Sequence, residues 1–180
     1  MPCRPASASA GFTLFELLAV IIILGLVVGM AALSVGAGGR DQQIEEQGNR
    51  FIALAGLARQ EVMLGGPSLA IGVTQHGYHF LHEVEVEDGV TAWLPLGEHR
   101  YLRNRDLLPD DLELELTLEG VDTRLELQPE QPDPHIYVYG TGEVTEFNLV
   151  IRDMREPDRK RVVTGDLGGQ LELRRELPDD

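Results

Sequence analysis

The sequence predicts an α+β protein in which a long N-terminal helix, first transmembrane and then amphipathic, packs on a C-terminal antiparallel β domain folded as a small sandwich. Three observations predict this class: an apolar run near the N-terminus, apolar residues at helical spacing directly after it, and alternation with a period of two from Ser68 onward. With 180 residues, the chain has room for one membrane element and one modest folded domain.

The apolar run covers residues 17–33, LLAVIIILGLVVGMAAL, and would form a helix about 26 Å long. The preceding residues from Phe12 extend it to the thickness of a bilayer, so we expect a transmembrane helix over residues 12–35. A cleaved secretory signal and a plain uncleaved anchor both remain open on this run alone. Neither alternative gives a reason for Glu16 at the N-terminal end of the run. An unpaired charged side chain at the edge of the bilayer's hydrocarbon core costs on the order of a few kcal/mol.

Residues 36–64 continue in helical rhythm as an amphipathic segment. One face of this helix would carry the apolar residues Ile44, Phe51, Ala55, Ala58 and Val62. Gly65, Gly66 and Pro67 are typical of a helix end. The glycines at 36, 38 and 39 weaken the helix by about 1 kcal/mol each relative to alanine, which predicts a hinge or melted stretch there.

Residues 65–180 are predicted to form a β-rich globular domain of about seven to nine strands separated by Gly, Pro and Asp turns. The segment 112–119, LELELTLE, alternates strictly between leucine and polar residues. This pattern is typical of a strand with one buried and one solvated face. We expect such strands to lay their apolar faces on the helix.

The composition argues against several classes of function. A net charge of −15 disfavours binding to nucleic acid through phosphate contacts. The chain lacks the common hydrolase, phosphate-loop, zinc-protease and Cys-x-x-Cys motifs, so we expect neither an enzyme nor a cofactor. Its one cysteine, Cys3, precedes the apolar run, so the folded part has no thiol.

Metal binding is not expected either. His76, His79 and His82 recur every three residues, which on a strand would divide them between two faces, so they are interpreted as surface residues. Acidic clusters such as Asp110 with Asp111 lack the order of an EF-hand and are interpreted as solvated turns. Trp93 is expected to lie in the core or to cover a sheet, rather than to anchor a partner.

The stretch AGFTLFE, residues 10–16, places a glycine, a phenylalanine and an acid directly before the apolar run. It resembles the processing site of the type IV pilin and type II secretion pseudopilin superfamily. The resemblance implies that residues 1–11 are a leader, that prepilin peptidase cuts after Gly11, and that Phe12 becomes the N-methylated terminus. It also implies that Glu16 acts in assembly, by meeting the new terminus of a neighbouring subunit.

Within that superfamily the chain resembles the H-type minor pseudopilins (GspH/FimT family). The resemblance rests on LARQEVMLGG at the predicted helix end, on GYHFL followed by AWLPL, and on IYVYGTGEVTEFNLVI. It implies a pilin-like fold and a structural subunit near the tip of the pseudopilus that helps export folded proteins across the outer membrane. The implied location is the bacterial inner membrane, as a single-pass protein with its C-terminal domain in the periplasm. The implied partners are other pseudopilins, both major and minor, the prepilin peptidase and the inner-membrane assembly platform.

Two alternatives remain open at this point. A type IV pilus minor pilin acting in adhesion or DNA uptake would share the N-terminal features, although the chain lacks the C-terminal cysteine pair common in major type IV pilins. A membrane-anchored periplasmic binding domain would instead require a ligand pocket. Its expected lining is aromatic: Tyr78, Trp93 and Tyr137.

Overall fold

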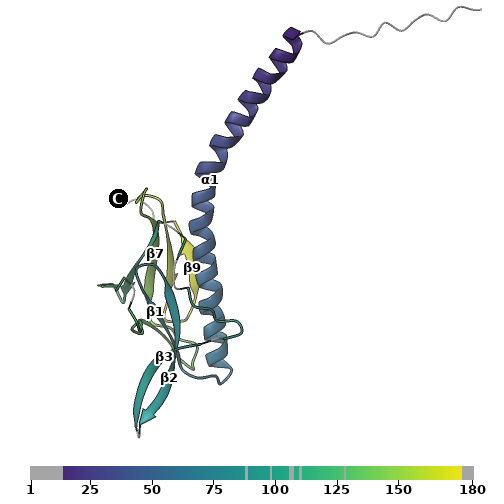
Figure 1. The fold of residues 1–180 in the computed structure, drawn as a ribbon. Coiled ribbons are helices and arrows are strands. Elements are labelled where there is room, and N and C mark those ends of the chain that lie inside the picture. Colours follow the sequence, from purple (N-terminus) through teal and green to yellow (C-terminus); the bar gives the residue numbers. More distant parts are fainter. Residues whose placement is uncertain are drawn as a thin grey trace, which may run out of the picture. The chain divides into compact units, whose positions relative to one another are not determined.

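A computed structural model describes residues 14–175 except 88, 98, 106, 107, 110 and 128, with the side chains of residues 29–38 also left undescribed (Figure 1). Two compact units are distinguished, Met1–Arg40 and Asp41–Asp180. Helix α1, Leu14–Met63, begins in the first unit and ends in the second.

In the first unit, the large apolar side chains of α1 project into solvent. Between Leu14 and Val28 their exposed fractions run from 45% at Val20 to 85% at Leu14. The predicted transmembrane segment, residues 12–35, lies only partly within the described residues. Among the residues that are described, the structure has no helix both long enough and apolar enough to span a membrane.

The expectation of a melted stretch at the glycines near residue 38 was wrong, because α1 is helical throughout Leu14–Met63. Adding a residue to an existing helix supplies one hydrogen bond for each residue ordered, and helical turns flank these glycines on both sides. The low helix propensity of these glycines therefore does not interrupt the helix, because the helix is already nucleated on both sides of them.

In the second unit, α1 presents the predicted apolar face to the β domain. Ile44, Phe51, Ala55, Ala58 and Val62 are all buried, with at most 6% exposed, which confirms the helical spacing. The helix ends where the glycines were expected to end it. Gly65 adopts φ of 91°, and its N–H donates to the Val62 carbonyl at 3.0 Å while the Gly66 N–H donates to Glu61 at 3.0 Å.

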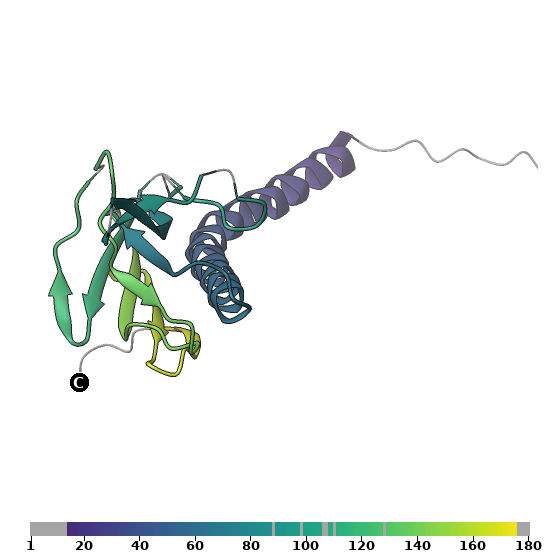
Figure 2. The same cartoon turned by 90° about the horizontal axis from the view of Figure 1, so that it is seen from below.

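The described residues form nine strands in two antiparallel sheets. The first sheet has the order β3-β2-β1-β6, and the second has the order β5-β4-β7-β8-β9. The strands are β1 Leu69–Val73, β2 Tyr78–Glu87, β3 Val90–Pro95, β4 Leu112–Leu118, β5 Val121–Thr123, β6 Ile136–Val138, β7 Phe147–Asp153, β8 Lys160–Gly165 and β9 Leu171–Arg174. Figure 2 looks almost along the second half of α1 and shows the strands on one side of it.

The core lies between this part of α1 and the two sheets. Strand β4 buries Leu112, Leu114 and Leu116 at 2% exposure each, while Glu115 between them is exposed, so the predicted alternation is confirmed. The ring of Phe51 makes edge contacts with Tyr78 of the first sheet, at 5.1 Å between centroids, and with Phe147 of the second, at 6.0 Å. One helical side chain therefore joins both sheets to α1. The α+β pilin-like arrangement expected from the sequence is present.

Candidate functional site

The predicted processing residues lie at the N-terminal end of the chain. Gly11 and Phe12 are outside the described residues, whereas Glu16 lies in the first turn of α1. The Glu16 side chain is exposed, and its neighbours Phe15 and Leu17 are also exposed, at 80% and 55%. A carboxylate in a first helical turn interacts favourably with the partial positive charge of the helix N-terminus. The site therefore presents an acid on an apolar helical surface.

The aromatic pocket expected of a binding domain is not formed. Tyr137 pairs with Ala70 of β1, whereas Tyr78 pairs with Val73, so their side chains leave opposite faces of the first sheet. Tyr78 points into the core and is 2% exposed. Trp93 and Tyr137 contact each other edge-on at 5.5 Å on the outer face, where Trp93 covers the sheet. The predicted convergence of these three residues was therefore wrong, because strand register divides them.

Two histidines, His76 and His135, make local hydrogen bonds to the backbone. His76 Nδ1 lies 3.1 Å from the carbonyl oxygen of Leu112. His135, which the sequence analysis did not single out, accepts a hydrogen bond from the Val73 N–H at its Nδ1 at 3.0 Å. Burial lowers the pKa of His135, and the Asp133 carboxylate opposes this effect. Within the described part of the chain, no three His, Cys, Asp or Glu side chains are grouped to hold a metal ion.

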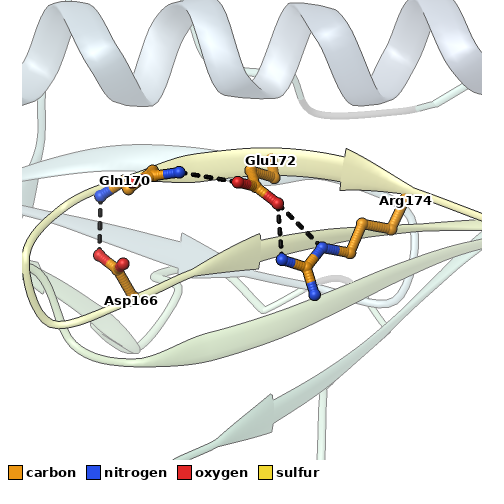
Figure 3. Close-up of polar contacts among 4 residues, drawn as sticks. All are labelled: Asp166, Gln170, Glu172 and Arg174. Atoms are coloured by element: carbon orange, nitrogen blue, oxygen red, sulfur yellow. Dashed lines mark hydrogen bonds and ion pairs between the residues drawn. The ribbon is translucent and has the colours of Figure 1, made fainter.

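A polar network covers the turn between β8 and β9 (Figure 3). The Gln170 N–H donates to Asp166 at 2.8 Å, its side-chain amide donates to Glu172 at 2.7 Å, and Arg174 Nη2 donates to Glu172 at 2.6 Å. The hydrogen bond from Arg174, followed by that from Gln170, lowers the pKa of Glu172. Since the carboxylates of Asp166 and Glu172 already accept hydrogen bonds within the network, the network fixes the turn and edge strand β9.

Arg59 is a second residue that sequence reasoning missed. Its Nε donates to the Gly142 carbonyl at 2.5 Å and its Nη2 to the Gly168 carbonyl at 3.1 Å. Gly142 and Gly169 have φ of 87° and 76°, and a Cβ at either position would crowd the guanidinium. The last turns of α1 are thereby attached to the turn after β6 and to the turn after β8. No local sequence pattern predicts this contact, because Arg59 lies 83 and 109 positions before the two glycines whose carbonyls it meets.

Comparison with known proteins shows which proteins this chain is similar to. The family described as "Prokaryotic N-terminal methylation motif" matches residues 6–32. The type II secretion system protein H of Aeromonas hydrophila is 28% identical, over 91% of this chain and 92% of that protein. Its namesake from Pseudomonas aeruginosa is 25% identical, over 88% of this chain and 92% of that protein. The chain is thus similar to type II secretion H proteins over most of its length.

Solved structures of H-type pseudopilins share the fold. The minor pseudopilin EpsH from the type II secretion system of Vibrio cholerae superposes with a TM-score of 0.62 at 23% identity, covering 77% of this chain and 99% of that one. The solution structure of Escherichia coli GspH gives a TM-score of 0.57 at 16% identity, covering 74% of this chain and 88% of that one. The matched methylation motif spans Gly11, Phe12 and Glu16.

Proposed function

We propose that this protein is a minor pseudopilin, a non-enzymatic structural subunit near the tip of a type II secretion pseudopilus that helps export folded proteins across the outer membrane. One observation carries the proposal: a single chain joins a methylation motif over residues 6–32 to an exposed apolar helix and to the two-sheet domain of H-type pseudopilins. Its partners are the major pseudopilin, the other minor tip subunits and the inner-membrane assembly platform.

The processing step follows from the motif. Prepilin peptidase cuts after Gly11, and Phe12 becomes the N-methylated terminus. The cut creates a positive α-amino group four residues before Glu16 on the same helix. An ammonium and a carboxylate attract each other much more strongly in a low-dielectric environment than in water, and each compensates the charge of the other. When the terminus belongs to a neighbouring subunit, this attraction sets the axial register of the growing fibre.

The proposed location follows from the distribution of apolar surface. Residues 12–35 anchor the chain in the bacterial inner membrane, and residues 36–64 and 65–180 lie in the periplasm. The exposed apolar side chains between Leu14 and Val28 support this placement, because water is a poor solvent for so much apolar surface. The second unit, by contrast, encloses its own core.

The processing proposal is tested by the intact mass of the protein. We expect protein from cells with active prepilin peptidase to lack residues 1–11 and to carry one additional methyl group, compared with protein from cells without the peptidase. Gly11→Val, which adds a branched side chain to the residue before the cut, should give the unprocessed mass in both strains. Gly25→Val, within the apolar run, should still be processed. An unchanged wild-type mass in the two strains would refute the proposal.

A further inference from the structure

The hairpin of β2 and β3 projects from the β domain. Strand β2 starts in the core, where Tyr78 and Phe80 are buried. Its second half and β3 form an arm, defined here as residues 82–94, which Figure 1 shows extending beyond the last turn of α1. Near the tip of the arm, Val86 and Val90 are 51% and 53% exposed. A two-stranded hairpin alone is marginally stable in water, so a partner that covers the arm would stabilise it.

The two faces of the arm differ in chemistry. The register places Val84 opposite Ala92, and side chains alternate along a strand, so these two share the face that continues from Phe80 in the core. This face is apolar along β3 as well, with the residues Val90, Ala92 and Leu94. On the other face, Glu83 lies opposite Trp93 and Glu85 lies opposite Thr91. The arm is therefore apolar on one face and acidic on the other.

The charge of the arm has a single sign. Residues 82–94 include the acids Glu83, Glu85, Glu87 and Asp88, and contain neither lysine nor arginine. The side chains of the three glutamates are exposed. Glutamates on other strands meet guanidinium groups, as Glu115 does with Arg152. Within the described residues, no lysine or arginine forms an ion pair with the three glutamates of the arm. The acidic face is thus complementary to a partner that brings basic side chains.

Strand β3 also has an open backbone edge. It is the first strand in the order β3-β2-β1-β6, so in the described part of the chain it pairs with a strand on one side only. The Leu96 N–H donates to the Phe80 carbonyl at 2.7 Å, which shows that every second residue of this segment directs its backbone toward β2. Thr91 and Trp93 are the residues in between, so their N–H groups point outward. The Trp93 carbonyl does so as well, because it accepts a hydrogen bond from the Gln131 side chain at 2.7 Å.

This edge has few of the features that keep other strands from adding to a sheet. Strand β3, VTAWLP, has no charged residue, and only Pro95 at its end lacks an N–H. The opposite edge of the same sheet is closed by the chain itself. There Tyr137 of β6 and Thr145 are joined by two hydrogen bonds of 3.1 Å each. The first sheet therefore has one closed edge and one open edge, and the open edge lies on the arm.

We propose that an extended segment of a neighbouring subunit, with apolar and basic residues in alternation, adds to β3 as a fifth strand of the first sheet. Its apolar side chains would continue the face of Val90 and Ala92. Since adjacent strands lie about 4.8 Å apart, its lysine or arginine side chains can reach across Thr91 to Glu85. A second copy of this chain fits less well, because two acidic arms would repel each other. That the segment belongs to a pseudopilus subunit rests on the proposed function.

The first test uses the full-length protein in mild detergent and a fluorescein-labelled peptide of eight residues that alternates valine with lysine. Fluorescence anisotropy should show saturable binding, and a valine–glutamate peptide should bind at least tenfold more weakly. Two further peptides carry N-methyl groups on the lysine amides or on the valine amides. Since only one of these two sets can face β3, the two methylated peptides should differ in affinity by on the order of tenfold.

Variants of the arm locate the binding. Thr91→Pro removes an outward N–H without removing a hydrogen bond to β2, so it should weaken binding by on the order of fivefold. Thr91→Val keeps the N–H and should stay within about twofold. Glu83→Gln with Glu85→Gln should also weaken binding by on the order of fivefold. The matched control, Glu45→Gln with Glu146→Gln, changes the net charge equally at exposed positions elsewhere and should stay within about twofold.

A charge-reversed variant guards against misfolding as the explanation. Glu83→Lys with Glu85→Lys should lose the lysine peptide and bind the valine–glutamate peptide, a gain that an unfolded arm would not give. The proposal is overturned if the two methylated peptides bind equally, if Thr91→Pro and Thr91→Val bind equally, or if the two glutamine doubles have the same effect. It is also overturned if sedimentation shows self-association that Thr91→Pro abolishes, since a second copy would then occupy the edge.

The identity of the partner is tested in cells that contain the secretion system. A benzophenone amino acid in place of Thr91 should crosslink to another pseudopilin, and the crosslink should disappear in the Glu83→Lys, Glu85→Lys background. A crosslink to a secreted protein alone, or none, would overturn the assignment to a neighbouring subunit. Peptide binding needs neither processing nor assembly, so its failure is distinguishable from a failure of the mass experiment.

Discussion

At the scale of single residues, His135 is the clearest case of a side chain whose protonation state is set by the fold. Its Nδ1 accepts a hydrogen bond from the Val73 N–H at 3.0 Å, and a protonated Nδ1 could not accept it. Burial lowers the pKa of His135 below its ordinary value, against the opposing charge of Asp133. The unfolded chain therefore binds a proton at this residue at a higher pH than the folded protein does.

The sign of the resulting pH dependence follows directly. Between the lowered folded pKa and the unfolded pKa of about 6.5, the unfolded state holds more protons, so the free energy of unfolding should fall as the pH drops through this window. His135→Asn keeps an acceptor but cannot titrate, so urea unfolding at a series of pH values should show a flatter dependence. Equal slopes in wild type and His135→Asn would contradict this account.

At the scale of elements, the guanidinium group of Arg59 joins the end of α1 to two separate turns of the β domain. Arg59 donates to the carbonyls of Gly142 and Gly168, which belong to the turn after β6 and the turn after β8. Apolar packing along the Phe51 face holds the helix against both sheets but does not specify how the two turns meet it. The polar contact supplies that specificity.

Arg59→Met keeps much of the aliphatic stem and removes the donors, leaving the partly buried Gly142 carbonyl and the exposed Gly168 carbonyl with fewer partners. We expect the free energy of unfolding to fall by about 1–3 kcal/mol. Arg124→Met, at an exposed position, should change it by less than about 0.5 kcal/mol. Urea unfolding followed by circular dichroism measures both. The role assigned to Arg59 is wrong if the two substitutions have the same effect.

At the scale of the whole molecule, the two compact units have different relations to solvent. The second unit buries its apolar residues between α1 and the sheets, whereas the described start of the first exposes almost all of its large apolar side chains. An apolar surface of that extent is stable only in contact with lipid or with other apolar helices. Glu16 is the carboxylate within that surface.

Glu16→Ala tests the assembly role. It should leave membrane association unchanged, because the apolar surface remains, and abolish co-purification with the other pseudopilins. Glu45→Ala, an exposed acid further along α1, is the matched control and should co-purify like the wild type. Membrane fractionation and affinity purification from cells containing the secretion system give the two readouts. Undisturbed assembly of the Glu16→Ala protein would remove the register role.

Local patterns in the sequence determined the helix face from Ile44 to Val62, the helix end at Gly65 and the alternating strand β4, and residues 10–16 indicated the N-terminal methylation motif. These features depend on neighbours within a few turns or residues, which a sequence displays directly. Only the tertiary structure decided that Tyr78 and Tyr137 leave opposite faces, that Arg59 meets two glycine turns, and that β3 forms an open edge of the first sheet. The physical reason is that strand register and loop attachment join residues far apart in the chain, and a one-residue shift in register reverses which face a side chain occupies.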